Sequence, residues 1–187
     1  MLLRIFSYFI IPVYTIFLAL QDSLFESNLS VISSNPQHKN DFMLWSIMVV
    51  LFLYLVLTKV IKNNQLRYSK LDRFFVYSSC LLLLLAAITP YVPTQDPLKA
   101  KWHIIFAFNS TVFLFLSFLS IILELYRKNT KQYRNHLIGI IAIVLVSILL
   151  LVLIGIVSGF LEIIITISAT LLAKSLFDNS KKASSVQ

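Results

Sequence analysis

Three ionisable side chains stand near the ends of apolar segments, and they are the first candidates for chemistry in this chain. Asp96 precedes an apolar segment that His103 opens, and Glu162 follows the stretch Gly-Ile-Val-Ser-Gly at 155–159. A histidine beside carboxylates can bind a cation or a polar ligand, and it can titrate near neutral pH. The sequence therefore predicts a ligand-binding cluster of Asp96, His103 and Glu162, provided that their segments meet.

Each candidate also has a purely structural interpretation. A carboxylate near a helix N-terminus, as expected for Glu162, is stabilised by unpaired N–H groups and by the helix dipole. A histidine next to Trp102 suits the interfacial belt of a membrane protein. Asn109 lies about two turns beyond His103 and is a fourth candidate for ligand binding. We expect Asn109 chiefly to form an interhelical hydrogen bond.

The residue inventory argues against most catalytic and metal sites. The chain has one cysteine, Cys80, three glycines, three histidines and eight acidic residues. These numbers exclude an intrachain disulfide framework, a cysteine-based zinc site and a glycine-rich phosphate loop. No spacing of serine, histidine and acidic residues indicates a nucleophilic triad. The sequence therefore predicts no metal, no cofactor and no catalytic residue.

The elements that must position these side chains are long apolar segments. Of the 187 residues, 58% are hydrophobic and 13% are charged. Soluble domains have about 45–50% apolar and about 25% charged residues. So small a globule cannot bury this excess of apolar surface, and we expect the segments to face lipid. Roughly 20 apolar residues suffice to cross a hydrocarbon core about 30 Å thick.

Six crossings are expected, which predicts an all-α, polytopic membrane helix bundle with a single domain. The last apolar run, 137–177, has about twice the length of one crossing. Its reversal is expected at Gly155 and Gly159, because glycine adopts the positive φ of a tight turn. A kink is expected at Pro90, and the polar tail 178–187 is expected to be cytoplasmic and disordered. The predicted spans are 2–20, 42–61, 74–92, 102–126, 137–155 and 159–177.

The basic residues predict that both termini lie in the cytoplasm. Of the 16 Lys and Arg residues, 13 fall on the side of the N-terminus, and the other three are Lys39, Lys99 and Lys101. Short cytoplasmic connections are enriched in Lys and Arg. We expect the basic side to contact anionic lipid head groups, and we expect no nucleic acid partner. A protein partner within the membrane is left open.

The first span has an alternative interpretation as a cleaved signal peptide. Its single basic residue, its apolar length and the poor cleavage site Leu18-Ala-Leu-Gln21 favour a retained helix, with a kink at Pro12. Cleavage would leave five spans. The polar segment 21–41 that follows is expected to lie on the membrane surface or to pack over the helix ends.

Two stretches of the chain resemble a known group. Leu29-Ser-Val-Ile-Ser with Asn40-Asp-Phe-Met-Leu-Trp-Ser46 resembles a loop and second-helix entry, and Thr89-Pro-Tyr-Val-Pro93 with Trp102-His-Ile-Ile-Phe-Ala-Phe108 resembles a third-to-fourth helix connection. The group is the six-span bacterial family of unknown function catalogued as DUF998, which is similar in layout to DRAM/Frag-type membrane proteins. The resemblance implies a six-helix bundle in a bacterial cell membrane and implies no activity.

The leading functional hypothesis is a non-enzymatic protein of the plasma membrane. It would sense or bind a ligand at its outer face, or serve as an accessory or protective subunit. The alternative is a small transporter or channel, which calls for polar residues through the whole membrane and an inverted repeat. A membrane-embedded enzyme that modifies lipids is a third, less favoured hypothesis.

Overall fold

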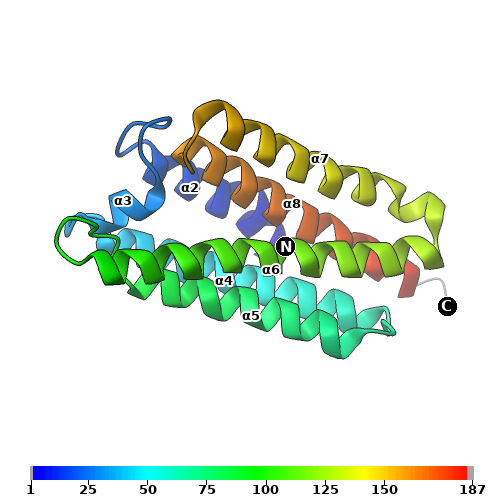
Figure 1. Cartoon of the computed structure of the whole chain (residues 1–187). Coiled ribbons are helices and arrows are strands. Elements are labelled where there is room, and N and C mark those ends of the chain that lie inside the picture. Colours follow the sequence, from blue (N-terminus) through cyan, green and yellow to red (C-terminus); the bar gives the residue numbers. More distant parts are fainter. Residues whose placement is uncertain (1, 185–187) are drawn as a thin grey trace.

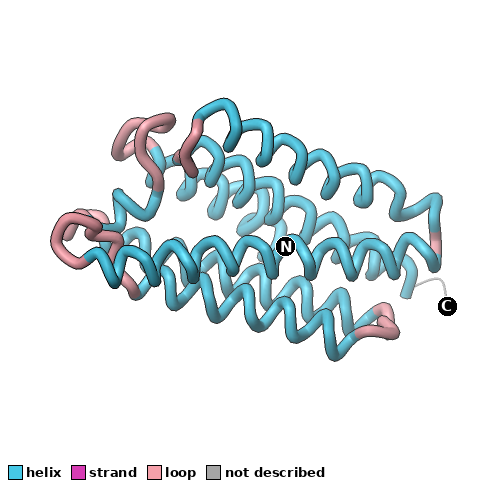
Figure 2. The backbone as a smooth tube through the Cα atoms, viewed as in Figure 1, coloured by secondary structure: helices cyan, strands magenta, loops and turns pink. Residues whose placement is uncertain are grey.

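The computed structural model describes residues 2–184, and all regular structure in this range is helical. Six helical segments are long and apolar enough to cross a membrane, which confirms the predicted membrane helix bundle. The first of them joins α1, a π-helical turn η1 and α2 (Figures 1 and 2). The elements are α1 (Leu2–Ile5), η1 (Phe6–Ile10), α2 (Ile11–Ala19), α3 (Leu29–Ser34), α4 (Lys39–Asn63), α5 (Ser69–Ile88), α6 (Pro97–Lys128), α7 (Thr130–Ile154) and α8 (Gly159–Ser184).

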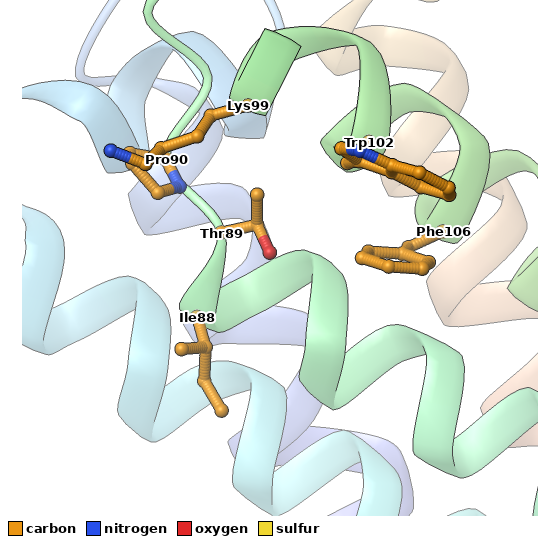
Figure 3. Close-up of a pocket in the computed structure, with 6 residues that line it drawn as sticks. All are labelled: Ile88, Thr89, Pro90, Lys99, Trp102 and Phe106. Atoms are coloured by element: carbon orange, nitrogen blue, oxygen red, sulfur yellow. The ribbon is translucent and has the colours of Figure 1, made fainter. Parts of the chain in front are cut away.

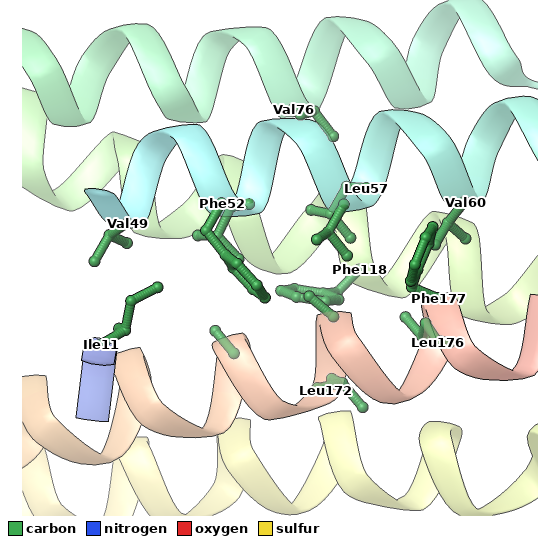
Figure 4. Close-up of a cluster of buried hydrophobic side chains, with 14 of the residues drawn as sticks. Ile11, Val49, Phe52, Leu57, Val60, Val76, Phe118, Leu172, Leu176 and Phe177 are labelled. Carbon is green, nitrogen blue, oxygen red and sulfur yellow. The ribbon is translucent and has the colours of Figure 1, made fainter. Parts of the chain in front are cut away.

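The helix α4 lies at the centre of the bundle, in contact with α2, α5 and α8, while α6 packs on α5 and α7. Figure 4 shows Leu57 of α4 facing Phe118 of α6 and Leu176 of α8, and all three are fully buried. Within an apolar stretch of 18 residues in α4, 56% of the residues are buried, whereas 11% are buried in the corresponding stretch of α7. Most of the apolar surface of α7 is therefore exposed.

The predicted reversal at Gly155 and Gly159 is confirmed. Gly155 ends α7 with a φ of +80°, and α8 begins at Gly159. The N–H of Gly159 donates to the Ser27 carbonyl at 2.7 Å, and the N–H of Phe160 donates to the Leu24 carbonyl at 2.9 Å. Two of the unpaired N–H groups at the start of α8 are thus satisfied by the segment before α3.

The first span is not a regular α-helix. The π-helical turn Phe6–Ile10 immediately precedes Pro12, which occupies the first turn of α2. A proline lacks the N–H of a helical hydrogen bond, and its ring displaces the carbonyl one turn earlier. The wider π turn accommodates this displacement.

Two predictions about helix ends were wrong. The helix α5 ends at Ile88 instead of continuing through a kink, because Thr89 is extended (φ −83°, ψ 116°), as a residue before proline prefers. The helix α8 continues to Ser184, so the disordered tail expected from 178 is helical up to this point. The last part of that expectation, 185–187, lies outside the described residues.

The bundle has two chemically different ends. We call the end formed by the connections 20–38, 89–96 and 155–158 the lid end, because α3 covers it (Figure 1, left). We call the end formed by 64–68, Asn129 and the last turns of α8 the basic end. The connection that carries α3 is by far the longest, whereas α6 and α7 are joined by Asn129 alone.

Candidate functional site

His103 joins three parts of the lid end. Its ring is buried, with Nδ1 at 2.7 Å from the Thr89 carbonyl oxygen and Nε2 at 2.7 Å from the Ser30 hydroxyl. Because a carbonyl can only accept, Nδ1 carries the proton and donates it, and in the neutral ring Nε2 accepts from Ser30. His103 of α6 thereby fixes both the end of α5 and the covering helix α3.

Glu162 binds the same covering helix from the other side. Its carboxylate accepts the N–H of Leu29 at 2.6 Å, at the first residue of α3. The side chain of Asn28 caps this helix by accepting the Val31 N–H at 3.0 Å and also donates to the Val157 carbonyl at 3.1 Å. The start of α3 is therefore attached to α8 and to the turn before it.

The predicted cluster forms only in part. Glu162 and His103 hold adjacent residues of α3, Leu29 and Ser30, but no hydrogen bond joins the two side chains. Asp96 bonds elsewhere, since it caps α6 by accepting the Lys99 N–H at 3.0 Å and pairs with the Lys99 ammonium at 2.9 Å. These bonds hold the pKa of Asp96 below its usual value, and the bond to the Lys99 side chain has the largest effect.

The prediction that Asn109 forms an interhelical hydrogen bond is wrong. Its amide donates to the Ile105 carbonyl at 2.8 Å within the same helix. The neighbouring Ser110 is buried and makes the bond across helices, to the Ser79 carbonyl of α5 at 2.9 Å. The two positions differ by 100° around α6, and the rotation of the helix determines which one faces α5.

We call His103 and Glu162, which both hold α3, the lid-end cluster. A shallow groove lies beside His103, between the end of α5 and the start of α6 (Figure 3). Its volume is about 480 Å³. Thr89 connects the groove to the cluster, because it lines the groove while its carbonyl accepts the bond from His103. Its lining is mostly apolar and includes one cation, and it consists of Ile88, Thr89, Pro90, Lys99, Trp102 and Phe106.

At the basic end, two acidic side chains that are not among the predicted site residues are buried. The Glu124 carboxylate accepts the backbone N–H groups of Arg67 and Tyr68 and lies 3.7 Å from the Lys128 ammonium. Asp72 of α5 is fully buried and accepts a hydrogen bond from the Ser120 hydroxyl at 2.5 Å. Both lie near the α5–α6 contact at its basic end.

A second buried polar group at this end joins α7 to α8. His136 Nε2 lies 2.9 Å from the Ser175 hydroxyl, while its Nδ1 has no hydrogen-bond partner among the described residues. Lys174 is 2% exposed and pairs with Asp178 one turn along α8. At the basic end, the last two helices therefore bury polar side chains among their apolar residues.

A regular polar stripe on α6 links the two ends, and its seven-residue spacing is visible in the sequence. The buried face of α6 presents a polar residue at every seventh position: His103, Ser110, Ser117 and Glu124. Residues seven apart fall on one face of a helix. Extending the spacing of His103 and Ser110 by two further heptads would have identified Ser117 and Glu124.

The described residues contain no group of three or more His, Cys, Asp or Glu side chains placed to hold a metal ion. Comparison of the chain with family models, with curated proteins and with solved structures found no match. The resemblance to the DUF998 group stays a prediction.

Proposed function

We propose that this protein is a non-enzymatic, multi-pass membrane protein that binds a ligand at the lid end and reports it through the covering helix α3. The observation that carries this proposal is the double role of Thr89. It lines the groove, and its carbonyl holds His103, which in turn holds Ser30 of α3. An occupant that displaces Thr89 would therefore also displace α3.

The groove favours an amphipathic ligand with a negative head group. Ile88, Trp102 and Phe106 offer apolar contact, and Lys99 contributes one cation to the lining. A phospholipid matches this combination, with an acyl chain along the apolar lining and its phosphate near Lys99. Such a phosphate would compete with Asp96, the present partner of Lys99.

The fluorescence of Trp102 tests this binding directly. Trp45, the other tryptophan, is buried, so a Trp45→Phe variant leaves Trp102 as the sole reporter. In vesicles, phosphatidylglycerol brominated on its acyl chains should quench Trp102 more strongly than brominated phosphatidylcholine. Lys99→Gln should abolish this preference and Lys39→Gln, at an exposed lid-end lysine, should retain it. Equal quenching by both lipids would refute the binding proposal.

In the proposed orientation the basic end faces the cytoplasm and the lid end faces outward, in the plasma membrane of a bacterium. The support is the excess of Lys and Arg at the basic end, where contacts with anionic head groups are also expected. With Cys80 replaced, single cysteines at the exposed Gln37 and Gln95 should react with an impermeant reagent added outside. Cysteines at Asn63 and Lys131 should not, and their reaction would overturn the orientation.

A small transporter or channel is the second candidate, and the polar stripe on α6 favours it. Its members extend from His103 near the lid end to Glu124 at the basic end. Reconstituted vesicles should then show a proton, sodium or potassium flux that falls at least tenfold in a Glu124→Gln variant. Vesicles without any such flux would leave the binding function as the better account.

A further inference from the structure

Asp72 differs from every other acidic residue in the described part of the chain in how completely it is buried. Its exposed fraction is 0%. One carboxyl oxygen, Oδ1, accepts the Ser120 hydroxyl at 2.5 Å, while the buried Oδ2 has no hydrogen-bond partner among the described residues. No ion pair to Asp72 occurs in this range either.

Glu124 lies one turn along α6 from Ser120 and is a carboxylate at the same end whose negative charge is balanced by hydrogen-bond donors and a cation. It receives two backbone N–H groups, from Arg67 and Tyr68, and the ammonium of Lys128 lies nearby. Charge-assisted bonds of this kind stabilise an ionised acid. Asp72 has one hydroxyl in place of these three donors.

The charged side chains around Asp72 do not supply the missing compensation. On its own helix, Lys70 and Arg73 are exposed, and on the neighbouring α4, Lys59 and Lys62 are exposed as well. The start of α5 favours negative charge, but no backbone N–H bond to the Asp72 side chain is formed among the described residues. On α6, the carboxylate of Glu124 follows Ser120 by one helical turn, and its negative charge repels a second one. The guanidinium of Arg67 stacks on the Tyr68 ring, 5.5 Å from its centre.

Two kinds of occupant could neutralise Asp72. A bound Na⁺ or divalent cation needs several oxygen ligands, and the Glu124 oxygens that could join Asp72 and Ser120 are already bound to N–H groups. A proton needs only the free oxygen. A buried group that lacks a partner for its charged form takes up its neutral form instead.

We propose that Asp72 is a proton-binding site at the α5–α6 contact, in which Oδ2 carries a proton at neutral pH. The step is the addition of one proton to the carboxylate, and Ser120 continues to donate to Oδ1. The proposal does not depend on the lid-end function. It makes the basic end a place where the protein exchanges a proton with the adjoining aqueous phase.

Infrared spectroscopy of the full chain in lipid vesicles tests the site, because only a protonated carboxyl group gives the free-acid C=O stretching band. We expect this band at neutral pH in the wild type. Aspartate labelled with ¹³C at its carboxyl carbon should shift the band, which separates Asp72 from the glutamates 124 and 162 without any mutation. Asp72→Asn should remove the band, while Asp22→Asn, at an exposed aspartate, should keep it.

Ser120→Ala provides a second variant if Asp72→Asn does not fold. Loss of the Ser120 hydroxyl should move the band to the frequency of a carboxyl group without a hydrogen bond. A wild type without the band at neutral pH would overturn the proposal, as would a band that ignores ¹³C-aspartate. Disappearance of the band on addition of NaCl, compared with the same concentration of choline chloride, would identify a metal cation as the occupant and also overturn it.

Discussion

The lid end and the basic end both bury ionisable side chains, but they satisfy them in different ways. At the lid end, His103 uses both ring nitrogens and Glu162 binds a backbone N–H, and in each case a partner comes from α3. At the basic end, Glu124 is well bonded, whereas Asp72 and His136 each keep one buried atom without a partner among the described residues.

The difference follows from the connections. The long segment 20–38 supplies hydroxyl and backbone groups that can fold back over the helix ends, and these groups become the partners at the lid end. The connections at the basic end are short, so they offer few groups beyond the N–H pair of Arg67 and Tyr68. Buried polar atoms there must find partners on a neighbouring helix or go without.

The largest effect of a single substitution is expected at the basic end. Glu124→Gln replaces a buried carboxylate that accepts two N–H groups, so we expect a loss of about 3 kcal/mol in the free energy of unfolding. Denaturant unfolding in detergent, followed by circular dichroism, measures it. Glu26→Gln, at an exposed glutamate, serves as the control and should change stability by less than about 0.5 kcal/mol. Equal losses in both variants would contradict the structural role of Glu124.

At the lid end, His103→Ala should cost about 2 kcal/mol, because it leaves the Thr89 carbonyl and the Ser30 hydroxyl without their partner. The effect should be local. Hydrogen exchange should accelerate in α3 and stay unchanged at 64–68, and His38→Ala, which removes no hydrogen bond of a described residue, should alter neither region. Unchanged hydrogen exchange in α3 would show that His103 does not hold this helix in place.

The two glycines of the α7–α8 turn sharpen the comparison within the lid end. Gly155→Ala forces a side chain into a positive φ and should cost about 1 kcal/mol, although open space surrounds the site. Gly159→Ala adds a Cβ at 3.6 Å from the Leu24 and Ser27 carbonyl oxygens, which is an ordinary contact, and should cost less than about 0.5 kcal/mol. Thermal unfolding of both variants checks the order, and the reverse order would contradict the turn.

The smallest effect is expected at Asp96, on the surface of the lid end. Its pKa is lowered from the usual 3.8, chiefly by the side-chain bond to Lys99. The ionised carboxylate therefore stabilises the folded protein above pH 3.8, and this contribution is lost as the pH falls through the lowered pKa. Asp96→Asn should remove this acid sensitivity from hydrogen exchange at the start of α6, and Lys99→Gln should reduce it. Unaltered sensitivity in both variants would exclude the pair as its cause.

Much of the candidate site could be predicted from position, and its bonding could not. The sequence places His103 and Glu162 at the same end of the fourth and sixth crossings, and both are indeed there. It could not show that the two bind neighbouring residues of α3, because the sequence left open whether 21–41 packs over the helix ends or lies on the membrane surface. The prediction for Asn109 failed for a different reason, since Asn109 and Ser110 lie 100° apart around α6 and only the rotation of the helix decides which one faces α5.

The sequence by itself determined that the chain has six apolar helices and that the last long apolar run reverses at Gly155. Both follow from local properties, namely the length of apolar segments and the conformational freedom of one glycine. Only the tertiary structure decided which polar side chains are buried and which groups they form hydrogen bonds with. Burial of Asp72 and the pairing of His103 depend on how helices rotate and which connection covers them, and these contacts are set by residues far away in the chain.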